Sequence, residues 1–113
     1  MKTPVAILLA LLFLSPGASA DCLKDQYGNV VCGQGQCATD SYRKVFCAHA
    51  GGGALADKFG KVMCGVGYCA RDSYLDVWCS TEPGGGAAVD LYGKVKCLGG
   101  CEPGSPERCE EGK

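Results

Sequence analysis

One eight-residue pattern occurs five times in this chain: Asp, any residue, an aromatic residue, two further residues, Val, any residue and Cys. The copies span residues 25–32, 40–47, 57–64, 72–79 and 90–97. A recurring pattern of this kind indicates a repeated structural unit whose copies pack on one another. The recurring residue types build turns, strands and cross-links, and they do not form a reaction centre.

Each unit reads as a β-hairpin. In the first copy, Asp25 and Gly28 stand at the first and fourth positions of a turn, which is typical of a type I turn followed by a left-handed residue. Such a turn places Cys22 opposite Cys32 at a non-hydrogen-bonded pair, where the α-carbons are close enough for a disulfide. The same spacing recurs in two other units. We therefore predict the disulfides Cys22–Cys32, Cys37–Cys47 and Cys69–Cys79.

The left-handed position is glycine in three copies, but it is Arg43 and Leu75 in the other two. A non-glycine residue there costs about 1 kcal/mol. These two hairpins therefore either use another turn or are held in a strained one by their disulfides.

Ala54 and Ala87 replace the first cysteine of the third and fifth units, which leaves Cys64 and Cys97 without partners in their own hairpins. The preferred pairing joins the two equivalent cysteines left over, and it adds a link within the C-terminal region: Cys64–Cys97 and Cys101–Cys109. A rival pairing closes the short loops instead: Cys32–Cys37, Cys64–Cys69 and Cys97–Cys101.

These patterns predict an all-β protein of small, disulfide-rich tandem β-hairpin repeats over residues 21–101, arranged as a meander or a short solenoid. Residues 102–113 are rich in proline and charge, and we expect an irregular tail pinned by Cys109. Phe46, Met63 and Trp78 share the repeat position before the last cysteine and are expected to form the small core. Lys96 at that position in the fifth unit indicates a solvated face near the end of the array.

Residues 1–20 have the features of a secretory signal: Lys2, an apolar run over 5–14 and a small-residue cleavage site at 18–20. The apolar run is too short to span a membrane. We expect no membrane span in the mature chain, which is predicted to be periplasmic or secreted. The ten cysteines, an even number in an oxidising compartment, predict five disulfides.

The Asp-Ser-Tyr phrases at 40–42 and 72–74, the links Cys32-Gly-Gln-Gly-Gln-Cys37 and Cys64-Gly-Val-Gly-Tyr-Cys69, and the ending Cys97-Leu-Gly-Gly-Cys101 carry a resemblance. The chain is similar to uncharacterised short secreted bacterial Cys-rich proteins with repeated Asp-Ser-Tyr-Gly and Cys-Gly-Pro-Gly-Gln-Cys phrases. The resemblance implies secretion and repetition, and it implies no activity.

The aromatic residues that share one turn position are the binding candidates: Tyr27, Tyr42, Phe59, Tyr74 and Tyr92. Two interpretations are open. The favoured one packs each ring over the adjacent hairpin, and the other forms a ladder that binds glycans or peptides. The Asp residues are expected to cap their own turns. Each turn supplies a single Asp, whereas a calcium loop needs several oxygen ligands.

The chemistry of the chain favours binding over catalysis. His49 is the only histidine, and it has no serine elbow or paired acid beside it. We predict no enzyme and no cofactor. The chain lacks a basic stripe, which argues against nucleic acid as a partner.

We expect a secreted binding or structural module whose partner is an extracellular polymer, an envelope component or a second copy. One alternative is a thiolate buffer for copper or zinc. Another is a small secreted toxin or antimicrobial protein, although the chain is slightly acidic and has no cationic face.

Overall fold

The computed structural model describes residues 21–113, which form short strands and one turn of 3-10 helix. The predicted signal, residues 1–20, lies outside the described residues. The elements are β1 (Asp21–Lys24), β2 (Val30–Gly33), β3 (Cys37–Thr39), β4 (Val45–Ala48), β5 (Ala54–Ala56), β6 (Val62–Cys64), β7 (Cys69–Arg71), β8 (Val77–Ser80), β9 (Ala87–Val89), β10 (Val95–Cys97), β11 (Cys101–Pro103), η1 (Pro106–Arg108) and β12 (Cys109–Glu111). The predicted all-β fold is confirmed.

The strands β1 to β10 pair in succession as five antiparallel hairpins, which we number from the first (β1–β2) to the fifth (β9–β10). Their registers follow the turn rule. In the first hairpin, Cys22 lies opposite Cys32 and Lys24 opposite Val30. The cysteine α-carbons are 4.0 Å apart in the first, second and fourth hairpins. The three predicted hairpin disulfides are confirmed.

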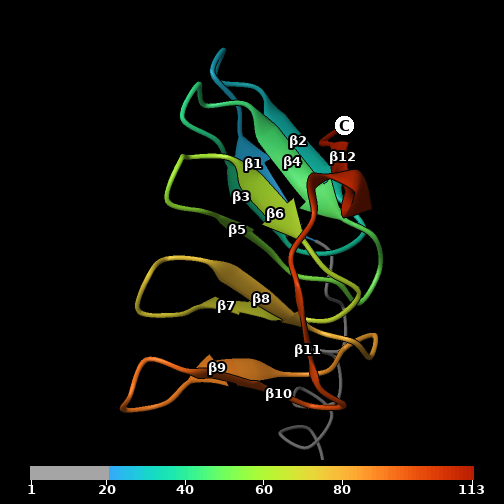
Figure 1. Cartoon of the computed structure of the whole chain (residues 1–113). Helices are drawn as coiled ribbons and strands as arrows, with labels where there is room; N and C mark the ends of the chain where they lie inside the picture. Colours follow the sequence, from blue (N-terminus) through green and yellow to red (C-terminus); the bar gives the residue numbers. More distant parts are fainter. Residues whose placement is uncertain (1–20) are drawn as a thin grey trace, which may run out of the picture.

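The hairpins belong to separate small sheets and stack face to face, as in a short solenoid rather than a meander (Figure 1). Apolar side chains fill the layers between them. Leu23 and Val31 of the first hairpin pack against a buried cluster that includes Val45 of the second. Ala54 and Val62 of the third hairpin belong to the next cluster. Each hairpin therefore buries its apolar face only by lying on a neighbour.

The repeat valines and cysteines, rather than the residues between them, form the buried core. Val45, Val62 and Val77 are buried. Phe46, Met63 and Trp78, which the sequence placed in the core, are only partly buried. None of the three is a buried core residue, although Phe46 packs against a buried cluster, and each of these side chains borders a surface hollow.

The outer face of the fifth hairpin is solvated, as its sequence indicates. Ala88 and Lys96 lie opposite each other in this hairpin, and both are exposed. In the third hairpin the same two positions hold the partly buried Leu55 and Met63. A lysine at the last position thus ends the stack with a polar face, as terminal repeats of solenoids do.

Residues 101–113 form two strands and a 3-10 turn, which corrects the expectation of an irregular tail over residues 102–113. We call this segment the C-terminal strap, because it turns back after the fifth hairpin and runs along the stack (Figure 1). β11 pairs with β8 of the fourth hairpin, and β12 pairs with β4 of the second. Between these strands, Ser105 makes an antiparallel bridge to Cys64 of the third hairpin. Local sequence did not predict β11 and β12, because each pairs with a strand that is distant in the sequence.

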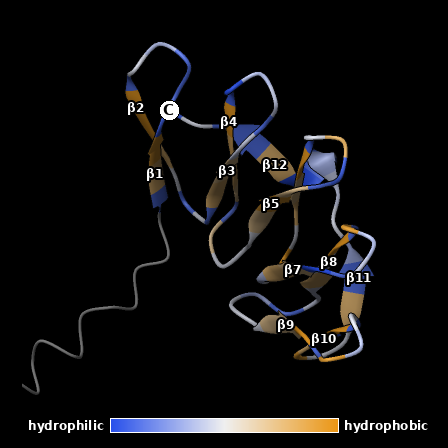
Figure 2. Ribbon diagram, turned by 90° about the vertical axis from the view of Figure 1, so that its left-hand side faces the viewer, coloured by the Kyte–Doolittle hydropathy of each residue, from blue (hydrophilic) through white to orange (hydrophobic). Residues whose placement is uncertain are grey.

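The strap reaches the first hairpin at its last residue. The amide of Lys113 donates to the carbonyl of Cys32 at 2.9 Å, and the amide of Cys32 donates to the carbonyl of Lys113 at 2.7 Å. The strap thus covers one edge of four successive hairpins, and it satisfies backbone groups that an exposed edge would leave open to other chains. Its strands β11 and β12 carry hydrophilic residues, drawn in blue in Figure 2.

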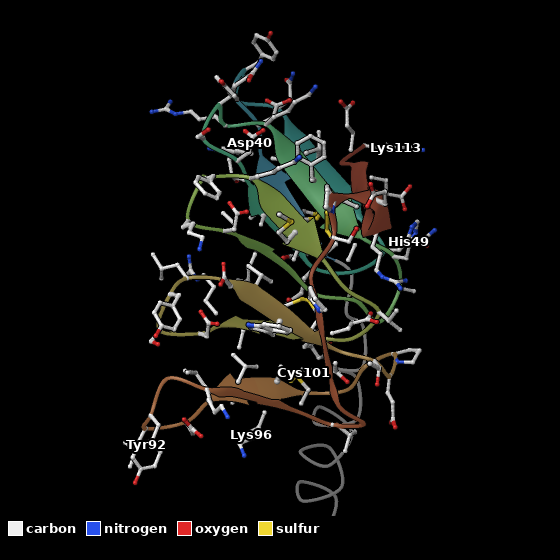
Figure 3. All side chains as sticks on the ribbon, in the orientation of Figure 1. Asp40, His49, Tyr92, Lys96, Cys101 and Lys113 are labelled. Atoms are coloured by element: carbon white, nitrogen blue, oxygen red, sulfur yellow. A yellow bond between two sulfur atoms is a disulfide. The ribbon has the colours of Figure 1, made fainter. Side chains whose placement is uncertain are left out.

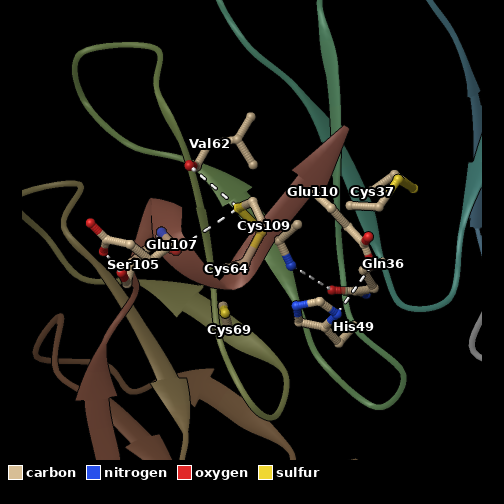
Figure 4. Close-up of a disulfide and its surroundings, with 12 residues drawn as sticks. Gln36, Cys37, His49, Val62, Cys64, Cys69, Ser105, Glu107, Cys109 and Glu110 are labelled. Atoms are coloured by element: carbon tan, nitrogen blue, oxygen red, sulfur yellow. Dashed lines mark hydrogen bonds and ion pairs between the residues drawn. A yellow bond between two sulfur atoms is a disulfide. The ribbon is translucent and has the colours of Figure 1, made fainter. Parts of the chain in front are cut away.

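The path of the strap also corrects two predicted disulfides. Cys64 pairs with Cys109 rather than Cys97, and Cys97 pairs with Cys101. The fourth hairpin lies between the positions of Cys64 and Cys97, so the equivalent cysteines do not meet. The strap instead brings Cys109 to the third hairpin (Figure 4). Of the rival short-loop pairings, only Cys97–Cys101 is present, where Gly99 and Gly100 adopt left-handed conformations.

Candidate functional site

The five hairpin turns share one construction, which begins with the carboxylate of the opening Asp. In the first turn, Asp25 Oδ1 accepts hydrogen bonds from the amides of Tyr27 at 2.9 Å and Asn29 at 3.0 Å. The turns that begin at Asp40, Asp57, Asp72 and Asp90 have the same pair of bonds. The predicted capping role of these residues is confirmed, and it fixes the turn conformation from within.

The fourth turn position is left-handed in every hairpin. The glycines there have φ between 77° and 82°, and Arg43 and Leu75 both have φ of 67°. The second and fourth hairpins therefore keep the common turn despite the steric cost of a side chain in this region. Of the two explanations open from the sequence, the strained turn is the one observed.

The aromatic residues at the turn tips project into solvent instead of packing over the next hairpin. Their exposed fractions run from 75% for Tyr74 to 88% for Tyr92. Figure 3 shows Tyr92 at the end of its turn, pointing away from the stack. The interpretation favoured from sequence is therefore wrong, because Asp-capped turns extend past the packed layers. We call this row the aromatic edge; its members are Tyr27, Tyr42, Phe59, Tyr74 and Tyr92.

Neighbouring turns are joined in two equivalent pairs. The amide of Ser41 in the second hairpin donates to the carbonyl of Gly60 in the third at 3.0 Å. The amide of Ser73 in the fourth hairpin makes the same bond to Gly93 in the fifth, also at 3.0 Å. A Cβ on Gly60 would crowd the Ser41 side chain, and Gly93 stands in the same relation to Ser73. The sequence carried a signal for this pairing, since Asp-Ser units precede units with a turn glycine.

The first turn pair encloses a hollow of about 650 Å³, which we call the upper cleft. Tyr42 and Phe59 line it from the two turns, and Phe46 and Val62 line it from strands β4 and β6. The strap supplies a further wall, which includes Glu110 and Glu111. Glu111 is also ion-paired with Lys44 at 2.8 Å, and this hydrogen bond is the main cause of a raised Lys44 pKa.

The second turn pair encloses a hollow of about 550 Å³, which we call the lower cleft. Tyr74 and Tyr92 line it from the turns, and Trp78 and Val95 line it from strands β8 and β10. Cys101 stands where the strap begins. The upper and lower clefts are therefore the same structure built twice from a sequence repeat of 32 or 33 residues.

The two clefts differ in how their Asp caps are held. Asp72 Oδ2 accepts a hydrogen bond from the indole Nε1 of Trp78 at 2.9 Å. This bond, with backbone amides donating to the same carboxylate, lowers the Asp72 pKa below its ordinary value. In the upper cleft the residue equivalent to Trp78 is Phe46, which has no ring N–H to donate.

A lysine links the two turn pairs. Lys58, in the turn of the third hairpin, is 2.9 Å from Asp76 in the fourth, and its Nζ lies 5.8 Å from the centroid of the Phe59 ring. The hydrogen bond to Asp76 is the main cause of a raised Lys58 pKa. Exposed pairs of this kind contribute little to stability.

Tyr27 is the one member of the aromatic edge that lines neither of the two clefts. It borders a smaller hollow of about 130 Å³ between the first and second hairpins. Gly28 in its turn has no atom near its Cβ direction, so this turn has no paired neighbour of the Ser41–Gly60 type. The structure thus gathers four of the five predicted binding residues into two sites and leaves the fifth apart.

The ten cysteines, all within the described residues, form five disulfides. A sulfur bonded in this way is not a thiolate, which is the form that binds copper or zinc. His49 contacts the strap, with Nδ1 3.1 Å from Glu110 Oε2. The disulfides brace the scaffold, and two of their cysteines, Cys101 and Cys109, also line the lower and upper clefts.

Five disulfides suit a protein of an oxidising, extracellular environment. Within residues 21–113 the structure has no helix that is long and apolar enough to cross a bilayer. Comparisons with protein-family models, with curated proteins and with solved structures find no match to this chain.

Proposed function

We propose that this protein is a secreted binding module that recognises an extracellular partner through its aromatic edge. The observation that carries this proposal is the placement of five aromatic side chains, each at least 75% exposed, at the tips of Asp-capped hairpin turns, three of which belong to hairpins with a cross-strand disulfide. Large apolar side chains are seldom left in solvent in a row, and contiguous exposed apolar surface marks interaction sites. A rigid scaffold also lowers the entropy lost when a partner binds.

Binding through repeated units fits an extended or repetitive partner. Each turn pair offers a similar small surface, and several weak contacts on one polymer combine through effective concentration. The partner classes expected are a polymer outside the cell and a component of the cell envelope. If the protein is instead a structural module, its partner is a second copy of this chain, bound through the same aromatic edge.

The test begins with the mature chain, exported so that its disulfides form. A dilution series by light scattering measures self-association, and a screen against glycans and envelope fractions measures partner binding. We expect the variant Tyr42→Ala/Tyr74→Ala to lose the interaction that the native protein shows. Leu98→Ala is the matched control, because Leu98 is also exposed but follows β10, away from the turns.

Two results would overturn the proposal. One is a native protein that stays monomeric and binds nothing in the screen. The other is an interaction that Leu98→Ala weakens as much as the aromatic variant does, since the binding surface would then not be the aromatic edge.

A further inference from the structure

The upper and lower clefts share a set of equivalent side chains from their turns and strands. The matched positions are Asp40 and Asp72, Ser41 and Ser73, Tyr42 and Tyr74, Phe46 and Trp78, Phe59 and Tyr92, and Lys61 and Lys94. Both clefts therefore have three aromatic rings around a small group of polar residues. A ligand suited to one cleft is suited to the other.

The polar groups common to both clefts balance in charge. Each cleft has one carboxylate, one ammonium group and one serine hydroxyl among its matched residues. Together these groups offer hydrogen-bond donors and acceptors without a net charge. This combination suits a neutral ligand that carries many hydroxyl groups, since a hydroxyl both donates and accepts.

The aromatic rings add the second half of the recognition. A sugar ring has faces made of C–H groups, which pack on aromatic faces, and a rim of hydroxyls, which bond to polar side chains. Cleft volumes of about 550 and 650 Å³ fall in the range of small-ligand sites. The exposed turn tips leave both clefts open, so a polymer can enter one cleft and continue outside it.

Charged polymers fit these sites less well. The upper cleft has Glu110 and Glu111 on its strap wall, which disfavours a polyanion there. The lower cleft is lined by one acid and one lysine, Asp72 and Lys94, and so has no excess charge to attract a polycation. A neutral chain is the occupant that both clefts accept.

We propose that each cleft binds one sugar unit of a neutral polysaccharide, and that the two clefts engage the same polysaccharide chain. This inference rests on the proposed function and names its ligand class. In this arrangement the aromatic pairs Tyr42/Phe59 and Tyr74/Tyr92 pack on the faces of the sugar. The Asp, Ser and Lys side chains hydrogen-bond to its hydroxyl groups. Binding at both clefts supplies avidity that a single cleft lacks.

Trp78 is a fluorescent probe of the lower cleft, because it lines this cleft and is the only tryptophan of the chain. Neutral soluble glucans, mannans and xylans are titrated into the oxidised protein, with polygalacturonate and cationic and neutral peptides as comparison ligands. We expect at least one neutral polysaccharide, and none of the comparison ligands, to shift Trp78 fluorescence and to give a calorimetric binding signal.

Three variants separate the sites. Tyr42→Ala/Phe59→Ala removes the upper pair, and Tyr74→Ala/Tyr92→Ala removes the lower pair. Each is expected to weaken polymer binding about 100-fold, because one cleft alone has no avidity. The upper variant should leave the Trp78 response to a short oligosaccharide unchanged. Leu98→Ala is the control, since Leu98 is exposed but lines neither cleft, and we expect less than a twofold effect.

The substitutions are at exposed positions, so correct disulfides and an unchanged circular dichroism spectrum are expected for all three variants. The inference is overturned if no neutral polysaccharide binds, or if binding survives both double variants. If an envelope protein or peptide binds instead and is lost in the same variants, the sugar assignment is wrong while the aromatic edge remains the binding surface.

Discussion

The opening Asp of each turn shows how a single side chain determines local structure. One carboxylate oxygen accepts two backbone amides in all five turns. Sequence alone predicted this role, because an Asp at the first turn position bonds to the amides that follow it. It did not predict the exposure of the aromatic tips, which depends on how far each turn extends beyond the stack.

The stabilising effect of the Asp72 carboxylate in its turn depends on pH. The indole N–H of Trp78 and two backbone amides favour the charged carboxylate, so the Asp72 pKa is lowered in the folded protein. The ionised Asp72 carboxylate therefore stabilises the folded protein above the unfolded-state pKa of about 3.9. This stabilisation is lost as the pH falls through the lower pKa of the folded state. We expect Trp78 fluorescence to change with a midpoint below about pH 3.9.

Asp72→Asn is the control for this titration, because the amide keeps an oxygen acceptor but does not ionise in this range. Its fluorescence should show no step of its own in acid. A native transition well above the ordinary Asp pKa, or an identical transition in Asp72→Asn, would contradict the assignment.

A second residue-scale prediction concerns the glycine that follows the repeat cysteine. A Cβ on Gly65 would overlap the Cβ of Cys79, whereas a Cβ on Gly86 would meet no atom within 4 Å. Gly65→Ala should destabilise the protein by about 1–3 kcal/mol through overpacking. Gly86→Ala should stay within about 0.5 kcal/mol. Urea unfolding followed by Trp78 fluorescence compares them, and equal effects would show that the close approach does not exist.

At the scale of elements, the hairpins were predictable and the strap was not. Turn type, register and three disulfides follow from residues at most ten positions apart. The strap depends on edges far away in sequence: β11 pairs with β8, and β12 pairs with β4. No short-range pattern identifies such partners, so residues 102–113 read as an irregular tail.

The strap disulfide should stabilise the molecule more than the disulfide that precedes it. Cys64–Cys109 spans a sequence separation of 45, and Cys97–Cys101 spans 4. Loop-closure entropy predicts a loss of about 4 kcal/mol for Cys64→Ala/Cys109→Ala and about 2 kcal/mol for Cys97→Ala/Cys101→Ala. Denaturant unfolding without reductant measures both. The reverse order would show that the strap is held by something other than this bond.

At the scale of the whole molecule, five hairpins are stacked in order and joined along one side by the returning strap. Repetition in the sequence indicated the stack. Repetition also suggested the wrong pairing of Cys64 with Cys97. These cysteines occupy equivalent positions in the third and fifth hairpins, but the fourth hairpin separates them. The clefts were missed for a similar reason: each is formed by two successive units, and no single unit contains one.

The most direct test of this arrangement is the disulfide map of the unreduced protein after trypsin digestion. Cleavage after Lys96 and Arg108 produces the peptide 97–108, which contains both Cys97 and Cys101. The structure predicts that this peptide is released alone with an internal disulfide, while peptide 109–113 stays linked to peptide 62–71 through Cys64–Cys109. Recovery of peptide 97–108 cross-linked to peptides 62–71 and 109–113 would mean Cys64–Cys97 and Cys101–Cys109, and would contradict the returning strap.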